Sequence, residues 1–235
     1  TPNDLILAVR AENQQTLTAV LENAEQWLHP EAGPAIRSAV RTLDEAIAHQ
    51  PHSNLAVISV PGAYAAREAQ KALEHGLNVF LFSDHVPLER ELTLKEYARQ
   101  RGLILMGPDC GTSIICGIGI GFANAIRRGP IGVIGASGTG IQEFTTLVHR
   151  AGSGISHAIG TGSRDLSDAI RGISFLSALD ALEFDAETKV IVVLSKPPGA
   201  QALERLAARI LRCRKPAVAC FLGLRKDLSP ANIRY

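Results

Sequence analysis

The residues best suited to chemistry lie in a glycine-rich run between an apolar segment and an amphipathic one. Ser137, Gly138, Thr139 and Gly140 follow the apolar residues 131–134 and lead into a predicted helix. Glycines let a ligand approach the backbone, and a helix start offers unpaired N–H groups and a partial positive charge. This arrangement favours an anion such as phosphate. No Lys follows the last glycine, so the run is not a Walker A loop, nor is it a full G-x-G-x-x-G. The alternative is a helix N-cap without a ligand.

Two other segments carry groups that suit an anion. Gly162 and Ser163 precede Arg164, whose forked guanidinium matches phosphate or carboxylate. Lys196 ends a strongly apolar run and precedes two prolines, which restrict the backbone there. The alternatives are a surface turn with an Arg164–Asp165 pair and a solvated lysine. We predict Arg164 and Lys196 as groups that stabilise developing charge.

The elements that would position these residues alternate between strands and helices. Expected strands are 5–9, 55–60, 78–83, 103–106, 131–134, 155–159, 190–194 and 217–222. Expected helices are 12–28, 34–49, 63–75, 88–100, 138–150, 166–184 with Gly172 as a candidate break, and 200–212. Such alternation predicts an α/β protein with parallel sheets, whose ligands sit beyond the carboxyl ends of the strands. The glycine-rich residues 108–130 hold no clear helix and separate two α/β units.

The cysteines indicate a reducing, cytoplasmic setting. Cys110, Cys116, Cys213 and Cys220 form no C-x-x-C pair, and no His cluster gives them zinc spacing, so we predict no metal site. Cys213 and Cys220 have apolar neighbours and are expected in the core. Cys110 has no placeable His base, so it is read as a packing residue or ligand wall rather than a nucleophile. His157, within a strand, is expected to be a core or interface histidine.

Composition excludes several classes of protein. The chain has 235 residues, with 24 Lys+Arg against 23 Asp+Glu, so no long-range field attracts nucleic acid or anionic lipid. Hydrophobic residues make up 46%, which argues against disorder. No apolar run reaches the roughly 20 residues needed to span a bilayer, and no signal segment opens the chain. We therefore expect no nucleic-acid or membrane partner. Because residue 1 is Thr, we also expect a truncated beginning, and a truncated end after the last strand.

Several of these loops resemble the alpha subunit of succinyl-CoA synthetase, over about residues 55 to 225. The matching segments are Val57–Pro61, Met106–Cys110, Ile131–Thr139 and Lys215–Val218. Within that superfamily the sequence is most similar to FdrA-like proteins, on Gly107–Ser113, Ile134–Glu143 and Ser195–Pro198. The resemblance implies a CoA-binding-type Rossmann domain over 1–125 and an incomplete flavodoxin-like ligase domain over 126–235.

The resemblance also implies site residues. The positions that match the CoA cradle of the synthetases, or a related nucleotide site, are Val60, Pro61, Ser83, Asp84, Asp109 and Cys110. Ser137–Thr139 match the phosphate-holding helix start. Three departures matter: residues 9–13 lack the glycine-rich CoA loop, Lys196 stands where the synthetases carry a Glu, and their phosphohistidine would lie beyond Tyr235. CoA or a nucleotide is therefore a candidate cofactor only, and a phosphohistidine relay is not supported.

Three functional hypotheses follow. FdrA-like proteins are associated with allantoin catabolism as components of an oxamate carbamoyltransferase, which converts oxamate and carbamoyl phosphate to oxalurate and phosphate. Lys196 in place of Glu favours such an anionic, phosphate-bearing substrate. The second hypothesis is an acyl-CoA synthetase subunit that uses a nucleotide triphosphate, and the third is a non-catalytic scaffold that binds an anion or nucleotide. The resemblance implies an oligomer, either with other subunits or with copies of this chain.

Overall fold

The computed structural model describes residues 10–24 and 40–223, and the chain divides into two units between Ala46 and Ile47. The first unit contains α1 (Gln14–Glu22), whose N-cap Asn13 accepts a hydrogen bond from the backbone of Thr16 at 2.8 Å. α3 (Leu43–His49) spans the division. Both helices are shorter than the predicted 12–28 and 34–49, which run in part outside the described residues. The predicted strand 5–9 lies wholly outside them.

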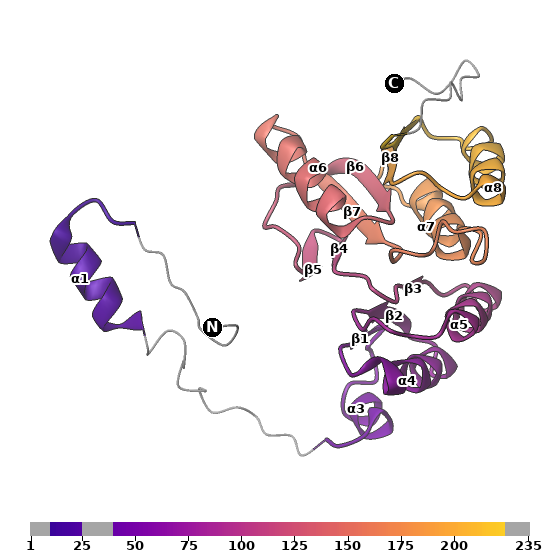
Figure 1. Cartoon of the computed structure of the whole chain (residues 1–235), viewed down its shortest axis with the longest axis horizontal. Helices are drawn as coiled ribbons and strands as arrows, with labels where there is room; N and C mark the ends of the chain where they lie inside the picture. The colour runs from indigo at the N-terminus through magenta and orange to yellow at the C-terminus, as the bar shows by residue number, and fades with distance from the viewer. Residues whose placement is uncertain (1–9, 25–39, 224–235) are drawn as a thin grey trace. The chain divides into compact units, whose positions relative to one another are not determined.

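The second unit contains two β-sheets (Figure 1). The strands are β1 (Leu55–Ile58), β2 (Asn78–Leu81), β3 (Leu105–Met106), β4 (Thr112–Ile115), β5 (Ile118–Gly121), β6 (Arg128–Gly135), β7 (Ile155–Gly160), β8 (Val190–Ser195) and β9 (Ala217–Phe221). The helices are α4 (Gly62–Glu74), α5 (Leu88–Gln100), α6 (Gly138–Arg150), α7 (Ile173–Phe184) and α8 (Ala200–Ile210). The smaller sheet has the order β1-β2-β3, and the larger has the order β5-β4-β7-β6-β8-β9.

The order in which strands are added to the larger sheet reverses at β6. β6 lies between β7 and β8 and is parallel to both, and β9 extends the parallel part beyond β8. The chain therefore leaves β6 toward one side through α6 and β7, then crosses to the other side through α7 and β8. In open α/β sheets a ligand crevice forms outside the carboxyl ends of the strands at such a switch point. The fold thus places a crevice where the loops after β6, β7 and β8 meet.

Apolar residues of β6 alternate between two cores because successive side chains of a strand point to opposite faces. Ile134 belongs to a cluster with Phe175 of α7 and Leu206 of α8. Val133 belongs to a second cluster with Ile141 of α6. The first cluster also includes Phe80 of β2, so it joins the smaller sheet to the larger one. Helices consequently cover both faces of the parallel strands.

The predicted α/β fold with parallel sheets is confirmed, and two elements differ from the expectation. Residues 108–130 contain the antiparallel hairpin β4–β5, and β4 also pairs antiparallel with β7. Its two-residue turn has positive φ at Cys116 (51°) and Gly117 (80°), as a tight hairpin turn of this kind requires. The predicted helix 166–184 is confined to α7, because Gly172 takes a left-handed conformation at its N-cap. Residues 166–171 form turns and a bend, so Gly172 marks the start of the helix and not a break within it.

The predicted boundary between residues 125 and 126 lies between β5 and β6, inside the larger sheet. The division into a CoA-binding-type and a ligase-type domain stays a prediction. Within the described residues, no helix is both long enough and apolar enough to cross a membrane.

Candidate functional site

Residues that follow five strands, β3, β5, β6, β7 and β8, line one cavity of about 270 Å³ in the second unit. It lies at the carboxyl ends of β6, β7 and β8, at the switch point of the sheet. Of the residues predicted to bind an anion, the cavity is lined by Ser137, Gly138, Thr139, Gly162, Ser163 and Lys196. Asp109 and Cys110, predicted for a nucleotide or CoA, line it as well. Gly140 and Arg164 do not.

The start of α6 supplies the donors of this cavity. Ser137 is the N-cap, and its Oγ accepts a hydrogen bond from the backbone N–H of Gly140 at 3.2 Å. The Gly140 N–H is therefore used within the cap. The N–H groups of Gly138 and Thr139 belong to the first turn and have no acceptor within the helix. They and the Ser137 hydroxyl proton are the groups that an anion could engage.

Gly162 lets the loop after β7 pack closely against the neighbouring wall of the cavity. It has φ +88°, and a Cβ there would lie 2.9 Å from the Cα of Gly107 and closer still to the carbonyl oxygen of Pro108. A glycine is thus required for the loop after β7 to contact residues 107–108 of the smaller sheet's edge. Gly160, two residues earlier, also needs to be a glycine, because a Cβ there would lie too close to the Thr112 carbonyl oxygen.

Arg164 is engaged in an ion pair away from the cavity. Its guanidinium lies 2.8 Å from the Glu91 carboxylate and donates to the carbonyl oxygen of Val86 at 2.7 Å. The predicted alternative, a surface pair of Arg164 with Asp165, is wrong, because Asp165 is fully buried. Its carboxylate contacts Lys95 Nζ at 2.7 Å.

Lys95 and Asp165 form the centre of a buried charge network. Lys95 Nζ also contacts Glu91 at 3.1 Å and donates to the carbonyl oxygen of Thr161 at 2.9 Å. The Asp165 carboxylate accepts hydrogen bonds from the backbone N–H groups of Ser174 and Phe175 in the first turn of α7. The network therefore joins α5, the loop after β7 and the start of α7, and it holds the loop that lines the cavity.

Lys196 is the cation of the cavity. It follows β8, its side chain is exposed, and it makes no ion pair or hydrogen bond within the described part of the chain. Its ammonium group is therefore available to a ligand. Of the two charged residues predicted to act in catalysis, the structure brings only Lys196 to the helix start.

The six residues predicted for CoA or a nucleotide lie on three loops in contact with one another. Asp109 N–H donates to the carbonyl oxygen of Ser83 at 3.0 Å. The Ser83 hydroxyl accepts from the Val60 N–H and donates to the Val60 carbonyl oxygen. That hydroxyl is therefore committed to the fold. Pro61 is the N-cap of α4, and the exposed Asp84 pairs with His85.

Cys110 is a wall of the cavity and not a nucleophile. It is buried, and burial raises the pKa of its thiol to about 11, although the Ser113 hydroxyl and other neighbours partly oppose this. The thiol therefore stays protonated near neutral pH. This agrees with the predicted packing or wall role. Cys213 packs partly buried against the main core, but Cys220 is exposed on the edge strand β9, contrary to the expectation that it is a core residue.

Three polar or aromatic lining residues were not predicted from the sequence. Gln142 of α6 donates to the Thr112 hydroxyl of β4 at 2.8 Å, and both line the cavity. Phe122, which is 67% exposed, stands at its edge and contacts Phe82 edge to face, with ring centroids 5.3 Å apart. Only Gln142 could have been placed near the site from the sequence, because it lies one turn into the predicted helix 138–150. Thr112 and Phe122 reach the cavity through the β4–β5 hairpin, which was not predicted.

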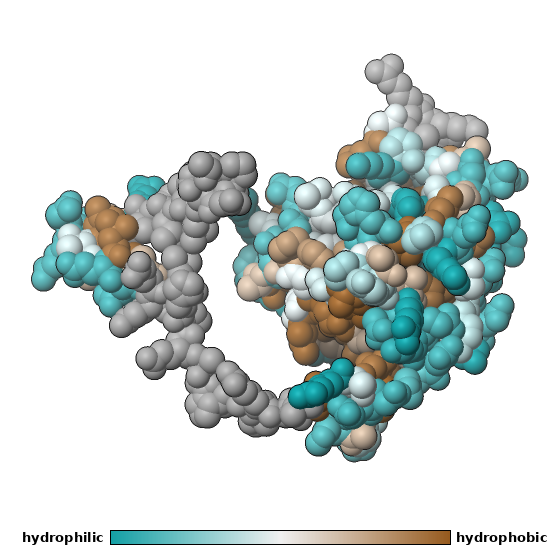
Figure 2. Space-filling model, turned by 60° about the horizontal axis from the view of Figure 1, so that its bottom comes forward, coloured by the Kyte–Doolittle hydropathy of each residue, from teal (hydrophilic) through white to brown (hydrophobic). Residues whose placement is uncertain are grey.

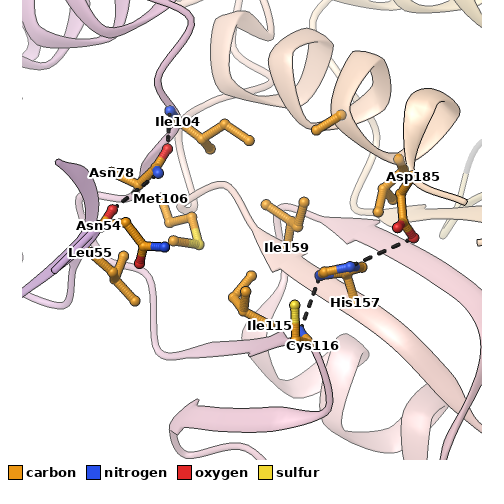
Figure 3. A pocket seen from close by; sticks show the side chains of 12 residues that line it. Asn54, Leu55, Asn78, Ile104, Met106, Ile115, Cys116, His157, Ile159 and Asp185 are labelled. Atoms are coloured by element: carbon orange, nitrogen blue, oxygen red, sulfur yellow. Dashed lines mark hydrogen bonds and ion pairs between the residues drawn. The ribbon is translucent and has the colours of Figure 1, made fainter. Parts of the chain in front are cut away.

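His157 lies on β7 and does not line this cavity; it stands between Cys116 and Asp185 (Figure 3). Its Nδ1 accepts the backbone N–H of Cys116 at 3.2 Å, and its Nε2 lies 3.6 Å from the Asp185 carboxylate. Burial lowers its pKa, outweighing the attraction of Asp185. The histidine is therefore neutral at pH 7 and links β7 to the hairpin turn.

We expect the His157 pKa to make the protein less stable in mild acid. Because the folded-state pKa lies below 6.5, the unfolded chain takes up the proton first as the pH falls. The free energy of unfolding should decrease from pH 7 toward pH 5, and His157→Gln, which cannot titrate, should lose less over that range. Urea unfolding at both pH values measures the difference. An identical loss in the two proteins would contradict the assignment.

No metal centre is apparent in the described residues. Within residues 10–24 and 40–223, no group of three or more His, Cys, Asp or Glu side chains is arranged to hold a metal ion.

Comparison with known proteins shows the relationship of this chain. It is 30% identical over 182 residues to the alpha subunit of the ADP-forming succinate–CoA ligase of Methanothermobacter thermautotrophicus, covering 76% of this chain and 60% of that protein. The chain is homologous to succinate–CoA ligase alpha subunits. It is also 46% identical over 220 residues to the uncharacterized protein YahF of Escherichia coli K12, covering 93% of this chain and 43% of YahF. It thus spans about half the length of these relatives.

Residues 127–213 match the family model described as CoA binding domain. This match falls within the segment that the resemblance assigned to the ligase-type domain. The fold is similar to that of ATP citrate lyase from Methanothrix soehngenii, with a TM-score of 0.68, 22% identity and coverage of 83% of this chain and 33% of that one. It is also similar to an acetyl-coenzyme A synthetase of Ca. Korarchaeum cryptofilum, with a TM-score of 0.57, 20% identity and coverage of 72% and 38%.

Proposed function

We propose that this succinate–CoA ligase homologue is part of an acyl-transferring enzyme and that its cavity binds the phosphate of a small acyl phosphate. The observation that carries the proposal is the convergence of the α6 start, the loop after β7 and Lys196 on one cavity. Helix N–H groups and a free ammonium are the donors that phosphate prefers. The alpha-subunit relatives, named as CoA ligases, support an enzyme of the acyl-CoA synthetase type.

The chemistry of such a site is the departure of phosphate. An acceptor attacks the carbonyl carbon of the acyl phosphate, the bond between that carbon and the bridging oxygen breaks, and its electron pair leaves on phosphate. Lys196 and the N–H groups of Gly138 and Thr139 would stabilise the charge that develops on the leaving group. Fixed donors of this kind contribute strongly to catalysis because they need no reorganisation during the reaction.

Asp109 favours carbamoyl phosphate as the acyl phosphate. It lines the same cavity as Lys196 and has no side-chain partner among the described residues. A carboxylate repels phosphate but accepts hydrogen bonds from an amide. Carbamoyl phosphate carries both a phosphate and an NH₂ group, so one end suits Lys196 and the other suits Asp109. This supports the FdrA-like assignment to oxamate carbamoyl transfer.

CoA is the alternative ligand, at the loops that follow β1, β2 and β3. Val60, Pro61 and Ser83 would contact it through their backbone, since the Ser83 hydroxyl is already bonded. Asp84 and Asp109 add two negative charges there, which would oppose the phosphates of CoA. A bound CoA would favour the acyl-CoA synthetase over the carbamoyltransferase, and an anion bound without turnover would favour the scaffold.

Two broader proposals have separate support. The description of the relatives as alpha subunits supports an assembly in which other chains complete the active site. The four cysteines are free thiols, which supports a reducing, cytoplasmic setting.

We expect Lys196→Gln to weaken the binding of phosphate and of carbamoyl phosphate about tenfold, the equivalent of about 1.4 kcal/mol. Isothermal titration of the purified chain measures this. Lys189→Gln is the matched control because Lys189 precedes β8 at its opposite end and its ammonium bonds the Ala186 carbonyl oxygen. It should leave both affinities unchanged. Equal affinities in the wild type and Lys196→Gln would reject the cavity as the phosphate site.

Asp109→Asn distinguishes the ligands. The substitution should weaken the binding of carbamoyl phosphate but not that of acetyl phosphate, which lacks the NH₂ group.

Titration with CoA tests the synthetase alternative directly. Formation of oxalurate from oxamate and carbamoyl phosphate by the intact enzyme with its partner subunits tests the transferase, and its absence there would reject that reaction.

A further inference from the structure

A second cavity, of about 390 Å³, has Asn54, Leu55 and Asn78 on one side and Cys116, His157 and Asp185 on the other (Figure 3). It opens between the starts of β1, β2 and β3 and the hairpin turn with β7. Its inner wall is apolar and includes Leu55, Met106, Ile115 and Ile159. Figure 2 shows hydrophobic residues gathered on one face of the second unit with hydrophilic residues around them. A mostly apolar cavity with a few polar groups is the usual form of a small-molecule site.

Some polar groups of this cavity are hydrogen-bonded within the protein, and others have no such partner among the described residues. The Asn78 side chain is used by the fold, because it donates to the Asn54 carbonyl oxygen and accepts from the Ile104 N–H. The Asn54 carboxamide makes no hydrogen bond with the described residues. His157 uses Nδ1 as an acceptor, so its proton is on Nε2. That N–H lies 3.6 Å from Asp185, too far for a good hydrogen bond, and can serve a ligand.

The charge of Asp185 makes this cavity unfavourable for anions. Burial would raise the pKa of Asp185, but hydrogen bonds from Thr188 and from the backbone of Glu187 and Thr188 outweigh it and keep the pKa below its ordinary value. Asp185 is therefore ionised beside a neutral His157. The cavity carries a negative charge at its rim, the reverse of the Lys196 site.

We propose that this cavity binds a neutral, largely apolar small molecule through one carbonyl or hydroxyl group, which would contact the His157 Nε2–H and the Asn54 carboxamide. The site is independent of the proposed phosphate site because it shares no lining residue with it. Its rim residues Asn54, Cys116 and Ala181 are exposed, so a ligand has access from solvent.

The test uses prodan, a neutral naphthyl ketone whose emission shifts to the blue in apolar surroundings. The purified chain should bind it at micromolar concentration, and Ala181→Trp, which fills the rim from an exposed position on α7, should weaken binding at least tenfold. Ala208→Trp is the matched control, since Ala208 is an exposed alanine of α8 that lines neither cavity, and it should bind like the wild type. The anionic dye 8-anilinonaphthalene-1-sulfonate should bind more weakly than prodan.

A second readout does not depend on the variant. Bound prodan should slow alkylation of Cys116 by N-ethylmaleimide at least threefold, while the exposed Cys220 reacts at an unchanged rate. No prodan binding, equal binding by Ala181→Trp, tighter binding of the anionic dye, or no protection of Cys116 would each overturn the proposal.

Discussion

Replacing Lys95 by Met is expected to destabilise the protein by about 3–5 kcal/mol, because it leaves the Asp165 carboxylate buried without its cation. Lys95 Nζ contacts Asp165 at 2.7 Å and Glu91 at 3.1 Å, and all three side chains are fully buried. Arg164 would still neutralise Glu91 from its other side. Asp165 would keep only its backbone hydrogen bonds at the start of α7. Urea unfolding followed by circular dichroism measures the loss.

Lys71→Met provides the control for this prediction. Lys71 lies 3.1 Å from Glu68 on α4, but the two side chains are 40% and 35% exposed. Exposed pairs contribute about 0–1 kcal/mol, so the variant should unfold nearly as the wild type does. If Lys95→Met lost no more stability than Lys71→Met, the buried network would not hold the loop after β7 in the way described.

Replacing Gly162 by Ala is expected to destabilise the protein by about 2–4 kcal/mol, from backbone strain and overpacking together. The strain arises because φ is +88°, and the overpacking because the new methyl group would meet the backbone of Gly107 and Pro108. Since neither backbone can move aside like a flexible side chain, the loop after β7 must shift. The same variant should weaken phosphate binding at the cavity that this loop lines.

Gly152→Ala separates the two contributions. Gly152 has φ +86°, almost the same as Gly162, but a Cβ there would meet no atom within 4 Å. It should therefore show the strain alone, about 1 kcal/mol. Equal losses in the two variants would mean that the contact with residues 107–108 contributes nothing.

Much of the fold follows from the sequence because its strands and helices have strong, distinct periodicities. The predicted helices 88–100 and 138–150 match α5 and α6 at both ends. The hairpin β4–β5 was not predicted, since glycines interrupt its alternation and its turn begins with Cys116, which rarely adopts positive φ. The helix start at Ser137 could be predicted as an anion site from local physics, but the contact of Arg164 with Glu91 could not. That pair joins residues 73 positions apart in the chain, which no local pattern encodes.

By itself, the sequence determined the alternation of strands and helices, the glycine-rich start of α6 and the residues that follow each strand. These depend on local backbone preference and on side-chain periodicity. Only the tertiary structure decided which of those residues share a cavity. The strand order around β6 brings Lys196 to Ser137 and Gly138, while the buried Lys95 network takes Arg164 away from them. Strand order and buried charge pairing depend on contacts between distant residues, so they emerge only when the whole chain is folded.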